Sequence, residues 1–134
     1  MRALAETALG TYAVDLETEE VLGPEPPLET AASEETRLGL PRLVASAASG
    51  SLVVAIVDRR PPLLLSRDAG STWSEAGGGL PPGRAVAIDA DDPDLVLYAA
   101  RNRLYLSRDG GRFWQALAPE LPEIAAVAFA SAAA

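Results

Sequence analysis

The sequence predicts an all-β protein built from short antiparallel strands, and three observations lead to this prediction. The chain has 134 residues, of which 49% are hydrophobic and 22% charged, which is typical of one globular domain. Its apolar runs are short and are separated by Gly, Pro, Asp and Ser, so they have the lengths of strands rather than of helices. One stretch of sequence also occurs twice at a fixed spacing.

This internal repeat defines the units of the fold. Residues 63–73 read LLLSRDAGSTW and residues 104–114 read LYLSRDGGRFW, an ungapped offset of 41 residues. A period of this size is typical of four-stranded propeller blades. We therefore expect one blade at residues 43–83 and a second at residues 84–123. The expected strands are 43–48, 51–58, 62–66 and 72–76 in the first blade, and 84–89, 95–100, 103–107 and 113–117 in the second.

The two ends of the chain follow other patterns. Residues 1–42 form an acidic segment with an expected β-hairpin at 11–22, followed by a linker rich in Pro and Glu. Residues 124–134 provide the first strand of a further blade, at 124–130, and end in an Ala-rich tail. Two whole units and parts of others leave strand edges open. The sequence thus predicts a partial propeller, completed either by further copies of the chain or by hairpin 11–22 joining strand 124–130 in a shared blade.

Charge and composition exclude several classes of function. Residues 1–36 hold nine acids and one Arg, which accounts for the whole net charge of −8, and the rest of the chain is balanced. Nucleic acid is not an expected partner, because binding its phosphates requires a concentrated positive surface. No apolar run is long enough for a membrane helix, and Glu6 interrupts the place of a signal peptide, so we expect a cytoplasmic protein. The absence of Cys and His excludes disulfides, a cysteine nucleophile and the commonest general base.

Two motifs match the pattern S-x-D-x-G-x-T-W. Residues 66–73 match it fully, and residues 107–114 carry Phe in place of Thr. This pattern resembles the Asp-box, or bacterial neuraminidase repeat, of sialidases, sortilin-type receptors, some endoglucanases and the photosystem II assembly and stability factor. The resemblance covers about residues 43–130. It implies a propeller in which the boxes are structural hairpin elements, remote from the axis where ligands bind.

The chemistry of the box residues also favours a structural role. A Ser or Asp side chain in a tight turn can accept hydrogen bonds from unpaired backbone N–H groups. Gly adopts the positive φ angles that other residues resist, and Trp offers a large apolar surface for burial between neighbouring units. The residues assigned to this role are Ser66, Asp68, Gly70, Trp73, Ser107, Asp109, Gly111 and Trp114.

A cluster of four carboxylates lies between the first two expected strands of the second blade. Asp89, Asp91, Asp92 and Asp94 could together hold a hard cation such as calcium. A turn is the better interpretation, because the segment lacks Gly and Glu at the spacing of a calcium loop. We expect no cofactor, and calcium at these residues is the alternative.

The expected function is that of a noncatalytic scaffold or interaction module, a homo-oligomer that binds a protein or glycan partner through its loops. The alternative is a piece or subunit of a sialidase-like glycoside hydrolase. The resemblance implies that such an enzyme needs an arginine triad, a Tyr nucleophile paired with Glu, and an acid/base Asp on six blades. The chain has only two complete units for candidates such as Tyr12, Tyr98, Tyr105, Arg101 and Arg103. Carboxylates and tyrosines on one concave face would favour the enzyme.

Overall fold

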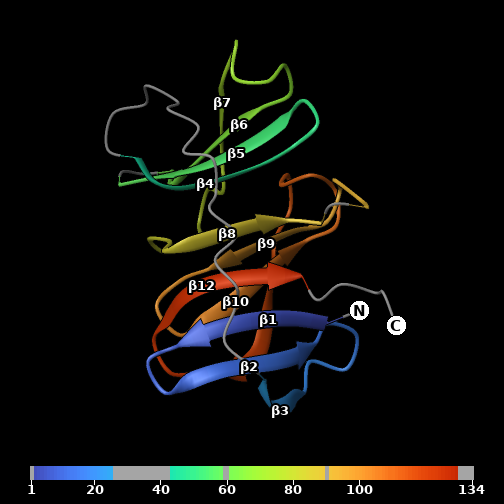
Figure 1. Cartoon of the computed structure of the whole chain (residues 1–134). Helices are drawn as coiled ribbons and strands as arrows, with labels where there is room; N and C mark the ends of the chain where they lie inside the picture. Colours follow the sequence, from blue (N-terminus) through green and yellow to red (C-terminus); the bar gives the residue numbers. More distant parts are fainter. Residues whose placement is uncertain (1, 26–42, 59–60, 90, 130–134) are drawn as a thin grey trace.

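The computed structural model describes residues 2–25, 43–58, 61–89 and 91–129, and the regular structure within these ranges is β-strand. Three four-stranded antiparallel sheets are stacked on one another (Figure 1). In these ranges no helix is long and apolar enough to cross a membrane. The predicted all-β fold of four-stranded antiparallel units is confirmed.

Two of the sheets are formed by consecutive strands. The sheet that we call blade 1 contains β4 (Leu43–Ser49), β5 (Leu52–Val57), β6 (Leu63–Ser66) and β7 (Ser74–Ala76) in that order. The sheet that we call blade 2 contains β8 (Ala85–Ile88), β9 (Val96–Ala99), β10 (Arg103–Ser107) and β11 (Gln115–Glu120). All residues of β5, β6 and β9 are buried, as expected of apolar runs without alternation.

The third sheet, blade 3, joins the two ends of the chain. Its order is β12-β1-β2-β3, with β1 (Arg2–Thr7), β2 (Gly10–Asp15), β3 (Val21–Glu25) and β12 (Ile124–Phe129). The expected hairpin, here β2 and β3, therefore shares a sheet with the C-terminal strand. Strand β1 was not predicted, and it lies between them, with Ala3 opposite Phe129 and Ala5 opposite Val127.

The boundaries of the two end segments also differ from those expected. The predicted linker begins at residue 23, but β3 extends to Glu25. The remainder of that linker, residues 26–42, and the Ala-rich tail from residue 130 lie outside the described residues. The third four-stranded unit is thus assembled from N-terminal and C-terminal strands that lie far apart in the chain, not from one continuous repeat.

Blade 2 lies between the other two blades and packs on both faces (Figure 1). Leu97 and Ala99 of β9 belong to the core shared with blade 3, while Val96 and Tyr98 belong to the core shared with blade 1. Because successive strand residues point to opposite faces, this alternation explains why every position of β9 is apolar or aromatic. Blade 1 contributes Leu52, Val54, Ile56, Leu63 and Leu65 to one of these cores, and the blade 3 side contributes Ala3, Ala5, Val14 and Leu16 to the other.

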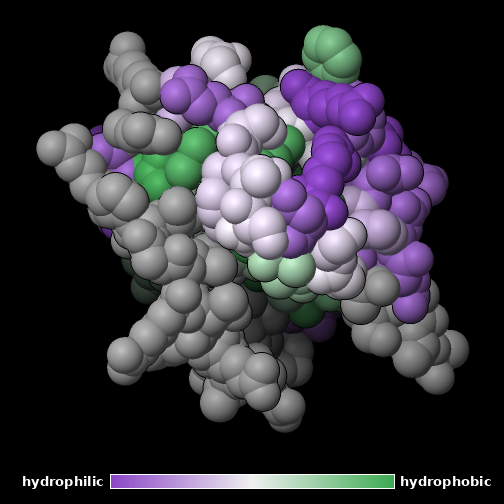
Figure 2. Space-filling view, turned by 90° about the horizontal axis from the view of Figure 1, so that it is seen from above, coloured by the Kyte–Doolittle hydropathy of each residue, from purple (hydrophilic) through white to green (hydrophobic). Residues whose placement is uncertain are grey.

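Figure 2 looks along the stack from the side of blade 1. Hydrophilic residues gather toward one side of this view, and the visible hydrophobic surface of the described residues is divided into small patches. Scattered apolar residues of this kind are normal on a protein surface.

The connection between blades 1 and 2 passes directly over a buried tyrosine. Tyr98 is 0% exposed, and its hydroxyl donates a hydrogen bond of 2.5 Å to the carbonyl oxygen of Pro81. A Cβ atom added at Gly83 would lie only 2.4 Å from the Tyr98 ring. The ring also contacts those of Tyr105 and Trp114, with centroids 6.0 and 5.7 Å away, so it has little freedom to move aside.

We predict that Gly83→Ala destabilises the protein by about 1–3 kcal/mol, the usual cost of inserting a methyl group into a packed core. Denaturant unfolding followed by tryptophan fluorescence measures this change. Gly78→Ala is the matched control, because no atom lies within 4 Å of its added Cβ, and it should change stability by less than about 0.5 kcal/mol. Equal effects of the two substitutions would contradict the close approach of Gly83 to Tyr98.

Candidate functional site

The residues singled out in the sequence lie in two equivalent turns. Box 1 (residues 66–73) connects β6 to β7, and box 2 (residues 107–114) connects β10 to β11. Both are therefore turns between the third and fourth strands of a blade. The Ser that opens each box is the last residue of the preceding strand and is almost completely buried.

In box 1, Ser66 and Asp68 bind the backbone of the turn. The Ser66 hydroxyl donates to Asp68 Oδ1 at 2.7 Å and accepts from the N–H of Gly70 at 2.8 Å. Asp68 Oδ1 also accepts from the N–H of Thr72 at 2.8 Å, and Asp68 Oδ2 accepts from the Thr72 hydroxyl at 2.5 Å. The two side chains thus satisfy N–H groups that the strand ladder leaves unpaired.

Box 2 repeats this arrangement with one difference. The Ser107 hydroxyl donates to Asp109 Oδ1 and accepts from the N–H of Gly111, both at 2.8 Å. Asp109 Oδ1 also accepts from the N–H of Phe113 at 3.0 Å. Phe113 replaces the Thr of box 1, so it offers no hydroxyl to Asp109, and it is 78% exposed.

The hydrogen bonds lower the pKa of both aspartates. In box 1 the Thr72 hydroxyl, followed by the Thr72 N–H and the Ser66 hydroxyl, lowers the pKa of Asp68 to about 2. In box 2 the N–H of Phe113 and then the Ser107 hydroxyl hold the pKa of Asp109 below its usual value. Donors that favour the charged carboxylate always act in this direction. Both aspartates are therefore ionised acceptors near neutral pH, which makes them unsuitable as general acids.

The box glycines have the backbone conformation that requires glycine. Gly70 and Gly111 both have φ of 96°, a region that L residues with side chains rarely adopt. The preceding position also has positive φ in both boxes, at 59° for Ala69 and 75° for Gly110. The two turns therefore share one backbone conformation, although box 1 uses Ala where box 2 uses Gly.

Each tryptophan immediately precedes a strand. The sequence predicts that Trp73 and Trp114 lie inside the strands, but β7 begins at Ser74 and β11 at Gln115. Trp114 packs against the core between blades 1 and 2, and its indole N–H donates to the Gly111 carbonyl at 3.0 Å. Trp73 packs against a smaller cluster in blade 1, which contains Ala55, Val57 and Leu64.

The carboxylates of the Asp89–Asp94 segment hold a turn. Asp89 Oδ1 accepts from the N–H of Asp91 at 3.0 Å, and Asp92 Oδ1 accepts from the N–H of Asp94 at 3.1 Å. The carbonyl of Asp94 also accepts from the N–H of Gly110 in box 2 at 2.9 Å. Within the described part of the chain, no group of three or more Asp and Glu residues is arranged to hold a metal ion.

A pocket of about 480 Å³ lies at the other end of the blade 2 strands. It is formed by the connection before β8, the turn between β9 and β10, and the end of β11. Box 2 begins at Ser107, the last residue of β10, whereas the pocket lies around Arg103, the first, so the two features lie at opposite ends of this strand. The lining residues are Pro81, Pro82, Arg84, Ala100, Arg101, Asn102, Arg103, Tyr105 and Glu120.

The pocket is positively charged in a protein whose net charge is −8. Arg84, Arg101 and Arg103 line it together with a single carboxylate, Glu120. Arg103 Nη2 donates to Glu120 Oε1 at 3.1 Å, and Arg84 Nη2 lies 2.9 Å from Glu123 Oε1 just outside the lining. Arg101 forms no ion pair with any described residue.

The tyrosines considered in the sequence analysis have different environments. Tyr105 lines the pocket with Glu120, so a tyrosine and a carboxylate do lie on one concave surface. However, the Glu120 carboxylate pairs with Arg103 and no Asp lines this pocket. Burial raises the pKa of Tyr98 well above its usual value, and its hydroxyl is bound to Pro81, so Tyr98 is not available as a nucleophile. Tyr12 belongs to blade 3, on β2.

Arg101 and Arg103 are candidates from the sequence, whereas their neighbours Arg84 and Glu120 are not predicted by it. These residues come from three separate segments, which are brought together by the pairing of β9 with β8 and β10 and of β10 with β11. The sequence signal that could have indicated the pocket is the pair Arg101 and Arg103 at a turn after a fully buried strand.

Comparison with solved structures identifies the architecture. The chain is similar to YCF48 bound to D1 peptide, with a TM-score of 0.50 and 23% identity, over 61% of this chain and 27% of that chain. It is also similar to a GH74 enzyme from Niastella koreensis, with a TM-score of 0.48 and 20% identity, over 86% of this chain and 17% of that chain. No protein-family model and no curated protein matches the sequence. At these identities the likeness concerns the fold alone, and the described residues form an open, partial β-propeller with three four-stranded blades.

We predict that Asp68 stabilises the folded protein above its ordinary pKa of 3.8 and that this contribution is lost as the pH falls toward 2. Carboxyl NMR titration gives the pKa, and denaturant unfolding between pH 5 and pH 2 gives the stability. Thr72→Val removes the largest cause of the shift, so it should raise the pKa of Asp68 and move the loss of stability to higher pH.

Box 2 supplies the reciprocal variant. Phe113→Thr places a hydroxyl where box 1 has one, and it should lower the pKa of Asp109 further while leaving that of Asp68 unchanged. An ordinary pKa for Asp68 in the unmodified protein, or no response to Thr72→Val, would show that these hydrogen bonds are not formed in solution.

Proposed function

We propose that this chain is a noncatalytic interaction module, built from Asp-box repeats. It binds a segment of a partner protein at the end of blade 2 where β9 turns into β10. The observation that carries the proposal is the pocket of about 480 Å³ formed by Arg84, Arg101 and Arg103 with the apolar side chains of Pro81, Pro82 and Ala100. Pockets of this volume with a few convergent polar groups are typical ligand sites.

The division of roles between the two ends of blade 2 supports this proposal. At one end, the Ser and Asp side chains of both boxes are used in backbone hydrogen bonds, so these residues serve the fold. At the other end, three arginines surround a cavity with a single carboxylate. The solved propeller YCF48 is bound to a peptide, which makes a peptide a reasonable class of ligand for a chain of this fold.

A sialidase-like glycoside hydrolase is the second candidate, and one observation favours it. Three arginines, Tyr105 and Glu120 share one pocket. Two features speak against hydrolysis at this site. Glu120 is bound to Arg103, and the lining contains no Asp for the acid/base role that the sialidase resemblance implies.

We also propose that the chain self-associates. The described strands provide three blades, and closed propellers typically have about four to eight, so two copies would provide enough blades for a ring. The edge strands β4, β8 and β12 have sequences without charge or proline, whereas the opposite edge strands β3 and β11 carry Pro24 and Pro119. Proline and charge protect an edge from pairing with another chain, so the first set of edges is the less protected.

Light scattering after size-exclusion chromatography tests self-association. Over a concentration series, we expect a defined mass of two or more chains at high concentration and one cooperative thermal transition. A monodisperse monomer of 13.9 kDa at every concentration would contradict it.

Selection of peptides from a displayed library tests the interaction function. We expect selected peptides to bind saturably and to shift the amide NMR signals of residues 83–84 and 100–105, but not those of the boxes. Methylumbelliferyl glycosides, including a sialoside, should not be hydrolysed above the rate of a Tyr105→Phe variant. Hydrolysis that is lost in the Tyr105→Phe variant, together with a library selection that yields no peptide, would favour the hydrolase instead.

A further inference from the structure

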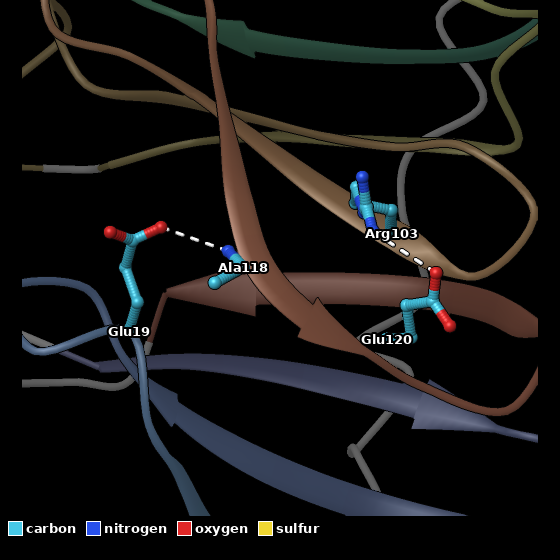
Figure 3. A network of polar contacts seen from close by, with 4 residues as sticks. All are labelled: Glu19, Arg103, Ala118 and Glu120. Carbon is cyan, nitrogen blue, oxygen red and sulfur yellow. Dashed lines mark hydrogen bonds and ion pairs between the residues drawn. The ribbon is translucent and has the colours of Figure 1, made fainter.

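The arginine pocket holds one carboxylate of the protein itself, in an ion pair that can be exchanged. Arg103 Nη2 donates to Glu120 Oε1 at 3.1 Å (Figure 3). The side chains of Arg103 and Glu120 are 38% and 69% exposed, so water reaches both. Exposed ion pairs of this kind contribute little to stability, and a competing carboxylate can replace one partner at low cost.

We propose that the pocket binds a carboxylate on a peptide segment of the partner protein, and that Glu120 occupies the position of that carboxylate while the partner is absent. This inference rests on the proposed function and adds to it the chemical class that is recognised. Arg101 supplies a cation without a partner among the described residues, and Arg103 supplies one whose partner can leave. Guanidinium groups bind carboxylates with two parallel hydrogen bonds, which gives the site directional specificity.

The backbone that carries these arginines is already fixed. The carbonyl of Arg101 accepts from the N–H of Ile124, and that of Asn102 from the N–H of Leu121, both at 2.8 Å. The turn between β9 and β10 is therefore tied to the connection between β11 and β12. A fixed turn reduces the ordering that ligand binding requires, which favours affinity.

Release of Glu120 does not require movement of its strand. Glu19 Oε1 accepts from the N–H of Ala118 at 2.9 Å, so a residue of blade 3 holds β11 two positions before Glu120 (Figure 3). Strand pairing with β10 holds the backbone of Glu120 itself, opposite Arg103. The side chain can thus turn toward solvent while the pocket walls remain in place.

A peptide suits this pocket better than a free anion does. Pro81, Pro82 and Ala100 provide apolar surface beside the cations, and Tyr105 adds an aromatic ring. The volume of about 480 Å³ is far larger than a single carboxylate and accommodates the adjoining chain. The net charge of −8 repels a negatively charged partner, so binding of such a partner depends on the arginines that line the pocket.

Fluorescence anisotropy with defined probes tests the inference on the full chain. The probes are a fluorescein-labelled octapeptide of glutamate with an amidated C-terminus, the same peptide of glutamine, and the glutamine peptide with a free C-terminus. An oligogalacturonate is the sugar probe. We expect the glutamate peptide to bind and the amidated glutamine peptide not to bind. Binding of the glutamine peptide with a free C-terminus would show that a terminal carboxylate is sufficient.

Three variants locate the site. Arg101→Gln should weaken binding of the glutamate peptide about tenfold or more, whereas Glu120→Gln should tighten it about threefold, because it removes the competing carboxylate. Arg108→Gln is the matched control: it makes the same charge change beyond the opposite end of β10 and should leave affinity within twofold. Thermal melts of each variant establish that it is folded.

Several outcomes would overturn the inference. Equal weakening by Arg101→Gln and Arg108→Gln would mean that net charge alone attracts the peptide. No gain from Glu120→Gln would exclude Glu120 as the stand-in. Equal binding of the amidated glutamine peptide would reject the carboxylate while leaving the interaction function standing. Binding of the oligogalacturonate alone would reject the peptide, and failure of these probes together with an empty library selection would reject both proposals.

Discussion

The pairing of β12 with β1 is the interaction on which the rest of the structure depends. These strands come from the two ends of the chain, and their pairing places Ala3 opposite Phe129. It creates blade 3, whose residues Ala3, Ala5 and Val14 close one of the two large cores. Without this blade, the face of blade 2 that carries Leu97 and Leu104 would lose the surface that covers it.

The same pairing also supports the pocket. The N–H of Ala8, in the turn after β1, donates to the carbonyl of Glu123 at 3.0 Å, so blade 3 holds the connection between β11 and β12. That connection in turn holds the carbonyls of Arg101 and Asn102. A chain of main-chain hydrogen bonds thus runs from the joined ends of the protein to the arginines that we propose as its binding site.

The sequence was most informative where structure depends on local chemistry. The repeat predicted the four strands of blades 1 and 2, because each buried run such as 52–57 lies between turn residues. The Ser and Asp of each box indicated side-chain acceptors for a turn, since these contacts span at most four residues.

Contacts between distant segments could not be predicted in this way. Strand β1 was missed because Glu6 interrupts its few apolar residues, and although it pairs with the neighbouring β2, its second partner β12 is more than a hundred positions away. Its alternating burial is visible only once the sheet exists, with Ala3 and Ala5 buried and Leu4 partly exposed. The pocket was missed for the same reason, because Arg84, Tyr105 and Glu120 are neighbours only through strand pairing.

A cysteine pair across the joined ends tests the account most directly. The chain has no Cys, so Leu4→Cys with Ala128→Cys introduces one possible disulfide at opposed positions of β1 and β12. Opposed residues on antiparallel strands have Cβ atoms about 4.5–5.5 Å apart, close enough for a disulfide after small adjustments. Under mild oxidation, mass spectrometry should find an intrachain disulfide and the melting temperature should rise, whereas Leu4→Cys with Ala48→Cys of blade 1 should stay reduced. Failure of the first pair to link within one chain, or equal linking of both pairs, would contradict the joining of the two ends in one blade.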